Sequence, residues 1–115
     1  MSAATDGRVP VRIGPPAPAG QGCAVLAEAG VAIPGGPTAV FRLAPALGHA
    51  GGCACCRPRA AVAAALHALF QDRAHGRVAH FDRVLACPAG AAGAAAIRAA
   101  LSEDAFLAAR YRLEA

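Results

Sequence analysis

One stretch of the chain, residues 58–75, carries its apolar residues on a single helical face. The positions of this face are Val62, Leu66, Leu69 and Phe70. Such spacing is typical of an amphipathic helix. Pro58 suits the first helical position, where its missing N–H breaks no hydrogen bond, and Gly76 stands where glycine commonly ends a helix. The pattern therefore predicts a helix over residues 58–75.

Short apolar runs separated by glycine and proline predict strands along the rest of the chain. We expect strands at residues 9–13, 31–33, 38–44, 81–87 and 111–115. We expect further helices at residues 23–29, 94–101 and 103–110, the last with Ser102 as its N-cap. Because strands alternate with helices, residues 1–115 are expected to form one α/β domain. It would have a parallel sheet with flanking helices and a disordered tail at residues 1–8.

Composition and charge narrow the class of protein. The 115-residue chain has a net charge of +4, and its eleven basic residues are all arginines without a basic cluster. Few aromatic residues accompany them, so we expect no nucleic-acid partner. The longest uncharged apolar stretch, residues 84–97, is too short to cross a bilayer, and no signal-peptide pattern precedes the first strand. We expect a cytoplasmic protein with no membrane partner, where cysteines indicate metal binding, catalysis or burial rather than disulfides.

Three cysteines stand within four positions directly before the predicted helix at residues 58–75. Cys53, Cys55 and Cys56 have C-x-C-C spacing, and thiolates gathered at one point suit Zn²⁺ and similar divalent ions. The positive end of the helix favours thiolate over thiol, which strengthens metal binding and also raises redox reactivity. Spacing alone therefore leaves a metal site, a redox site and an inert turn open. His49 is a candidate fourth metal ligand.

The other candidate ligands are scattered along the chain. Cys23 and Cys87 are either a second thiol pair or two small buried hydrophobic residues, and Glu28 is a candidate oxygen ligand. Structural or exposed positions are expected for the histidines His67, His75 and His80. No Ser/His/Asp or Cys/His arrangement stands out, so nucleophilic chemistry would need a cysteine of the C-x-C-C run.

The cysteine motif also carries a resemblance to a known family. Gly52-Cys53-Ala54-Cys55-Cys56 resembles the G-C-x-C-C motif of the CobW-type metallochaperone GTPases, relatives of UreG and HypB. Further along, "FDRVLACPAGAAGA" resembles the family's "FDRVVIE" strand and the loop after it, and "ARYRLEA" resembles "YRLDAVV". The likeness covers residues 40–115 in register and residues 9–30 more weakly. It implies a P-loop-NTPase-like sheet, a metal ion as cargo and a GTPase site.

The nucleotide machinery of that family is altered in this chain. Residues 14–22 take the place of its phosphate loop, and Ala19 and Gly20 match the A-G pair of that loop. Gln21 stands where the family has the lysine that reaches the phosphates, and Gly22 where it has the threonine that holds Mg²⁺. The acidic residue after the "FDRV" strand is replaced by a cysteine. The resemblance thus implies a degenerate phosphate loop at Ala19–Gly22, and we expect neither GTP nor Mg²⁺ as a cofactor.

These features together predict an incomplete CobW-like domain that binds a Zn²⁺-like ion through its cysteine motif at residues 52–56. It would act as a metallochaperone or modulator that has lost nucleotide hydrolysis, with no catalytic residue of its own. Two alternatives stay open: a GTP-binding member of the family and a structural remnant without function. Because the last predicted strand ends with the chain, its sheet edge is expected to pair with a second copy or with an intact CobW-type protein.

Overall fold

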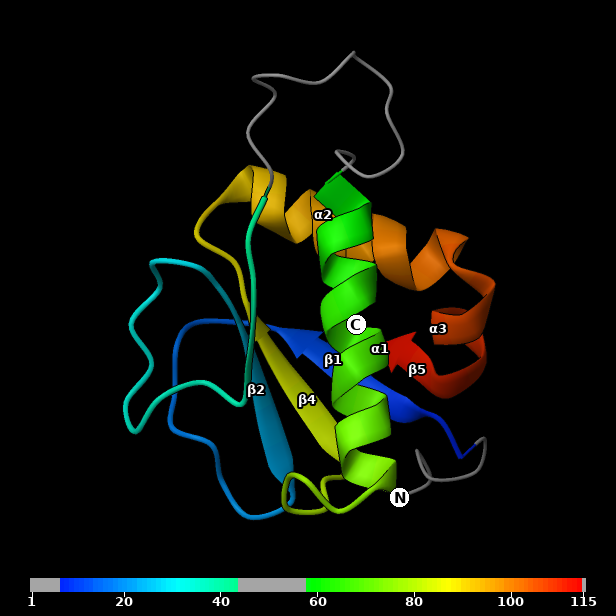
Figure 1. Ribbon diagram of the computed structural model, residues 1–115. Helices are drawn as coiled ribbons and strands as arrows, with labels where there is room; N and C mark the ends of the chain where they lie inside the picture. Colours follow the sequence, from blue (N-terminus) through cyan, green and yellow to red (C-terminus); the bar gives the residue numbers. More distant parts are fainter. Residues whose placement is uncertain (1–6, 44–57, 115) are drawn as a thin grey trace.

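The framework of the fold is a five-stranded sheet. The structure, a computed structural model, describes residues 7–43 and 58–114 (Figure 1). Its strands are β1 (Val9–Ile13), β2 (Cys23–Glu28), β3 (Ala39–Phe41), β4 (Arg83–Cys87) and β5 (Tyr111–Leu113). All paired strands run parallel, in the order β3-β2-β4-β1-β5, so the predicted α/β class with a parallel sheet is confirmed. The predicted tail at residues 1–8 lies outside the described residues except for Gly7 and Arg8.

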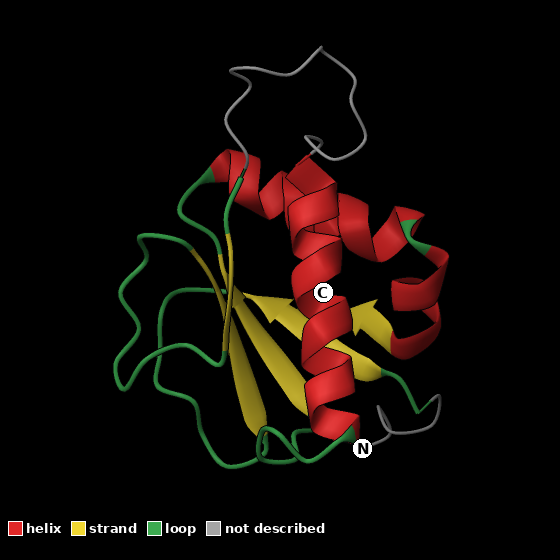
Figure 2. Ribbon diagram, viewed as in Figure 1, coloured by secondary structure: helices red, strands yellow, loops and turns green. Residues whose placement is uncertain are grey.

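Three helices cover one face of this sheet (Figure 2). They are α1 (Pro58–Ala74), α2 (Ala91–Glu103) and α3 (Ala105–Arg110). α1 connects β3 to β4, and α2 and α3 together connect β4 to β5. The helix predicted over residues 58–75 is confirmed and ends one residue earlier, while the helix predicted at residues 94–101 extends further at both ends.

Two predictions about local structure are wrong. Residues 23–29, predicted as a helix, form β2 and the start of the turn after it. β2 lies between β3 and β4, and Ala24–Ala27 are buried. A strand buried on both faces is a short continuous apolar run, which local composition does not separate from a short helix. Residues 31–33, predicted as a strand, belong to the loop after β2.

The N-cap of α3 also differs from the prediction. The Asp104 carboxylate accepts a hydrogen bond from the Leu107 N–H at 3.1 Å, which satisfies one of the free donors in the first turn. Ser102 belongs to the end of α2, where its hydroxyl donates to the Ala99 carbonyl at 3.3 Å. The cap therefore lies two residues later than expected, and α3 is correspondingly shorter.

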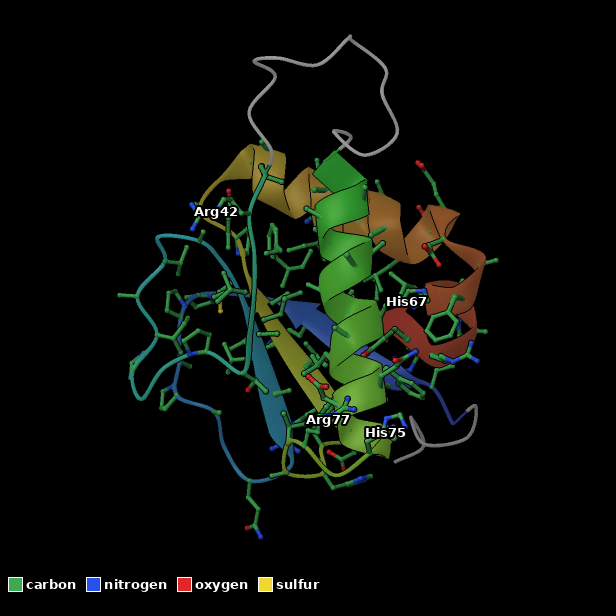
Figure 3. The ribbon with its side chains drawn as sticks, viewed as in Figure 1. Arg42, His67, His75 and Arg77 are labelled. Atoms are coloured by element: carbon green, nitrogen blue, oxygen red, sulfur yellow. The ribbon has the colours of Figure 1, made fainter. Side chains whose placement is uncertain are left out.

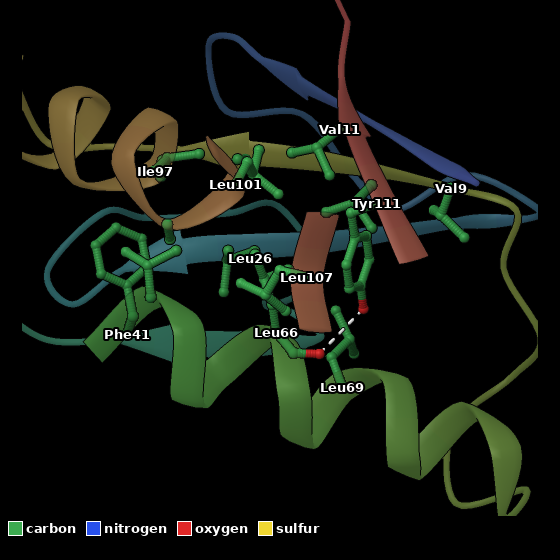
Figure 4. Close-up of a cluster of buried hydrophobic side chains, with 14 of the residues drawn as sticks. Val9, Val11, Leu26, Phe41, Leu66, Leu69, Ile97, Leu101, Leu107 and Tyr111 are labelled. Carbon is green, nitrogen blue, oxygen red and sulfur yellow. Dashed lines mark hydrogen bonds between the residues drawn. The ribbon is translucent and has the colours of Figure 1, made fainter. Parts of the chain in front are cut away.

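The main core lies between the helices and the sheet (Figure 4). Its largest fully buried side chains are Tyr111, Phe81, Leu26, Leu66, Leu69, Ile97 and Leu107. Tyr111 is the polar member of this group, and its hydroxyl donates a hydrogen bond to the Leu66 carbonyl at 3.0 Å. Burial raises the pKa of the Tyr111 hydroxyl. Because the buried hydroxyl has a partner, the edge strand β5 is joined to α1 without an unsatisfied polar group.

The opposite face of the sheet is covered by loops in the described part of the chain (Figure 1). Side chains alternate along a strand, so Val25 and Ala27 point away from the main core. They pack with Ile33 and Cys87 in a second, smaller cluster. Ile33 comes from the loop between β2 and β3. This loop therefore takes the covering position that a helix holds on the other face.

The connection from β1 to β2 lies on the same loop-covered face. It consists of residues 14–22, and no helix occurs within it. It passes close to the end of β4, as the distance of 3.8 Å between the Cys87 thiol and the Pro15 carbonyl oxygen shows. A parallel crossover that contains a helix needs about a dozen residues or more, so this connection has room only for an extended path.

Candidate functional site

The predicted metal ligands Cys53, Cys55, Cys56 and His49 lie outside the described residues. The described residues on either side of this segment are Leu43, which follows β3, and Pro58, which begins α1. In a parallel sheet, the carboxyl ends of the strands and the amino ends of the following helices share one edge, where ligand sites gather. Figure 1 shows α1 and α2 beginning at this edge. The described residues on both sides of the cysteine motif therefore lie at the carboxyl edge.

The residues aligned with the phosphate loop, Ala19–Gly22, lie at the other edge. The Gly22 carbonyl accepts a hydrogen bond from the Asp82 N–H at 2.9 Å, and the Gln21 carbonyl accepts one from Arg83 at 3.0 Å. Asp82 and Arg83 stand at the amino end of β4. The carboxyl end of β1 is followed instead by Gly14 and three closely spaced prolines. Since no helix follows within residues 14–22, no helix N-terminus faces a ligand there.

A pocket of about 680 Å³ lies beside these residues, between the β1–β2 connection and the segment before β4. Gln21, Cys23, Thr38 and His80 are its polar and sulfur-bearing lining residues. Cys23 and His80 are the two metal-ligand types among them, fewer than a tetrahedral zinc site needs from protein. In the ranges 7–43 and 58–114, no group of three or more His, Cys, Asp or Glu side chains could hold a metal ion.

The carboxyl edge contains a hydrogen bond that sequence reasoning missed. The Glu28 carboxylate, at the end of β2, accepts a hydrogen bond from the Ala89 N–H at 2.8 Å. Ala89 lies in the turn before α2, and the N-cap residue Gly90 supplies no side-chain cap. A negative charge at the amino end of a helix is stabilised by the free N–H groups and by the helix dipole. Glu28, a candidate oxygen ligand, thus places its carboxylate at the start of α2.

Gly93 allows this approach. A Cβ at position 93 would collide with the Glu28 carboxylate and lie 3.0 Å from the Cβ of Pro88. In the resemblance described above, Gly93 falls within "FDRVLACPAGAAGA", in the loop that follows the family's strand. In the fold it is instead a buried residue in the first turn of α2 that leaves space for Glu28. The contact joins residues 65 positions apart, so no local pattern could have signalled it.

Cys87 occupies the position where the resembled family has an acidic residue. Its side chain is buried in the smaller cluster, and burial raises the pKa of its thiol, although a backbone hydrogen bond from Ala17 lowers it. A neutral buried thiol cannot supply the negative charge that a Mg²⁺-bound water needs. The structure therefore agrees with the interpretation of Cys87 as a small buried hydrophobic residue.

Cys23 and Cys87 do not form a bonded pair, and both are free. β2 and β4 are parallel, with Cys23 opposite Arg83 and Cys87 opposite Ala27. The two cysteines therefore lie at opposite ends of this strand pair. Cys23 is half-buried and points its thiol at its own neighbour's carbonyl, that of Ala24, at 3.6 Å.

The described histidines have structural or exposed positions, as expected (Figure 3). The ring of His67 stacks on Phe106 with 3.7 Å between ring centroids, which ties α1 to α3. His75 lies at the end of α1, where its Nδ1 is 2.9 Å from the Gln71 carbonyl oxygen. His80 is exposed in the segment before β4.

Comparisons with family models, with curated proteins and with solved structures found no match for this chain. In the described ranges, no helix has the length and apolar character needed to span a membrane.

Proposed function

We propose that the protein binds one Zn²⁺-like ion through Cys53, Cys55 and Cys56, with His49 or water as a further ligand. The observation that carries this proposal is the C-x-C-C run, which ends two residues before the start of α1 at Pro58. Thiolates are strong ligands for zinc, and the positive end of a 17-residue helix lowers the cost of deprotonating a nearby thiol. The carboxyl edge of a parallel sheet is also where such folds usually hold ligands.

We further propose a role as a metallochaperone or modulator without nucleotide hydrolysis. Ala19–Gly22 lie at the edge opposite to the carboxyl end of β1, so they are remote from the position of a working phosphate loop. The chain also contains no lysine to reach a β- or γ-phosphate. A GTP-binding function is the alternative, and saturable GTP binding in the presence of Mg²⁺ would favour it. A remnant without function would bind neither ligand.

The metal content of the purified protein tests the proposal. Zinc titration of the reduced chain, followed by mass spectrometry, should give about one ion per chain and release protons as thiols become thiolates. Changing Cys53, Cys55 and Cys56 together to Ser should abolish this binding. The matched control is Cys23→Ser, which removes a half-buried free thiol outside the motif and should leave the stoichiometry unchanged. Retention of the ion in the triple variant would rule out this site.

Location and partners belong to the same proposal. A reducing compartment such as the cytoplasm keeps thiols available for metal, which fits free Cys23 and Cys87 in the described part of the chain. A second copy or a larger CobW-type protein would be the partner at the edge strand β5. Val40 and Leu113 are large apolar residues left exposed on the two outer strands.

A further inference from the structure

A pocket at the amino edge of the sheet has four arginines among its lining residues. It has a volume of about 400 Å³. Its described lining residues are Gly7, Arg8, Val9, Pro10, Arg73, Asp82, Arg83 and Arg112. The arginines come from four separate places: the segment before β1, the last turn of α1, the start of β4, and β5. Four arginines and one aspartate therefore line this pocket, although the sequence shows no basic cluster. The guanidinium group of Arg8 also donates to the Ala108 carbonyl at 3.3 Å.

Arg73 is held in place by two aromatic rings beneath it. Its guanidinium carbon lies 5.5 Å from the centre of the Phe70 ring and 5.3 Å from that of Phe81. Both distances are within the range of cation–π attraction. The Nε–H of Arg73 is buried and has no hydrogen-bond partner among the described residues. A buried donor without a partner calls for an explanation in a folded protein, and a role in binding an acceptor is one.

Arg83 is oriented by polar contacts instead. One of its terminal nitrogens donates to the Gln21 carbonyl at 3.0 Å, and the other to the Asp82 carboxylate at 3.2 Å. The side chains of Arg83 and Asp82 are 54% and 73% exposed, so both remain open to solvent at the pocket. A guanidinium fixed in this way loses less conformational entropy when it meets a second acceptor.

We propose that this arginine pocket binds the phosphate group of a small phosphorylated molecule. Planar guanidinium groups donate paired hydrogen bonds that match phosphate oxygens, and several positive groups around one point suit a multiply charged anion. The volume is in the range of pockets for small ligands. A nucleic-acid strand is a poorer fit, because base stacking needs exposed aromatic rings. Phe81 is 1% exposed, and the ring of Phe70 lies under Arg73.

The proposal is tested with inorganic pyrophosphate as the probe, by isothermal titration calorimetry at low ionic strength. The full chain should bind it saturably, and binding should weaken as NaCl is added. Arg73→Gln and Arg83→Gln should each weaken binding by about tenfold or more, since each removes charged hydrogen-bond donors. Arg83→Lys keeps the positive charge but loses the paired N–H donors of the guanidinium group. Its affinity for pyrophosphate should therefore stay close to that of Arg83→Gln. Because Arg83 is largely exposed, its variants are expected to fold even if those of Arg73 do not.

Arg42→Gln is the matched control. Arg42 is exposed beyond the carboxyl end of β3, away from Arg77 and His75 at the amino edge (Figure 3). Unchanged binding in this variant and in the triple Cys→Ser variant supports the pocket and separates it from the proposed metal site. Three results would overturn it: no binding of pyrophosphate, an equal loss in Arg42→Gln, or a clear preference for a single-stranded oligonucleotide over pyrophosphate.

Discussion

The two faces of the sheet are covered by different kinds of structure. On one face, three helices pack against the strands, and large side chains such as Leu66, Leu107 and Tyr111 are buried between them. On the other face, loops bury a smaller cluster in which Cys87, Ala27 and Val25 come from the strands and Ile33 from a loop. Both faces carry fully buried strand residues. The difference lies in what covers them, because a helix satisfies its own backbone hydrogen bonds and a loop must find partners elsewhere.

The hydrogen bonds of the loop-covered face follow from this need. The Thr38 N–H donates to the Val25 carbonyl at 2.8 Å, and the Thr38 hydroxyl accepts from the Val25 N–H at 3.0 Å. The Gly14 N–H donates to the Ala86 carbonyl at 3.0 Å. The loops are thus hydrogen-bonded to strand residues, and the apolar cluster beneath them is the smaller of the two. We expect the helical face to carry most of the stability and the loop-covered face to open first.

The largest expected effect is that of Leu66→Ala on the helical face. Leu66 is fully buried on α1, and its removal leaves a cavity among residues that cannot easily close it. The free energy of unfolding should fall by about 3 kcal/mol, as for large-to-small changes in a packed core. Urea denaturation followed by circular dichroism measures it. The control is Ala68→Ser on the exposed side of the same helix. A loss below about 1 kcal/mol would contradict the assignment of the main core to this face.

Ile33→Ala on the loop-covered face should have a smaller effect. Ile33 is 8% exposed and belongs to a loop that can move inward when its side chain is shortened. We expect a loss of about half that of Leu66→Ala, because the cost of a cavity falls when the surroundings can collapse. The same denaturation experiment measures it, with Ala32→Ser in the same loop as the control.

Alkylation of Cys87 gives an independent measurement for Ile33→Ala. Burial raises the pKa of this thiol, so little thiolate is present near pH 8 and its alkylation in the folded protein should be slower than that of Cys23. Ile33→Ala should speed the reaction at Cys87, and Leu66→Ala should do so less for a given loss of stability. If variants of equal stability on the two faces speed the alkylation of Cys87 equally, the two faces open together.

The sequence predicts the helical face well and the loop-covered face poorly. α1 has its apolar residues at helical spacing, with Pro58 at its start, so a local pattern determines it. β2 has no such pattern, because Ala24–Ala27 are buried on both sides and their composition favours a helix. The length of the connection between β1 and β2 is a signal that the sequence analysis overlooked. Its residues are too few for a crossover that contains a helix, so no helix can follow the phosphate-loop position.

Candidate positions for a site can be recognised in the sequence only where they are adjacent. The cysteine motif is visible because its members lie within four positions, and its role stays a prediction. The arginine pocket combines Arg8, Arg73, Arg83 and Arg112, which the parallel sheet brings to one edge, and their spacing in the chain carries no signal. Glu28 and Gly93 likewise meet only because β2 ends beside the start of α2. Such contacts depend on strand order, which local patterns do not specify.

The smallest expected effect is that of Gly93→Ala, at the point where the carboxyl edge meets the helical face. Alanine is normally more favourable than glycine inside a helix by about 1 kcal/mol. Here the new Cβ would displace the Glu28 carboxylate from the Ala89 N–H and press on Pro88. Losing a hydrogen bond to a charged group costs about 1.5–3 kcal/mol, so the free energy of unfolding should fall by about 1 kcal/mol in net terms.

A double-mutant cycle with Glu28→Ala separates the two contributions to the Gly93→Ala effect. Without the carboxylate, the Cβ at position 93 meets only the Cβ of Pro88 at 3.0 Å, and the helix-forming advantage of alanine is retained. Gly93→Ala should then be neutral or stabilising in the Glu28→Ala background, which gives a coupling energy of about 1 kcal/mol or more between the two residues. Ala95→Gly, at an exposed position of the same helix, measures the difference in helix propensity between alanine and glycine alone. If Gly93→Ala destabilises both backgrounds equally, the glycine serves helix packing and leaves no special space for Glu28.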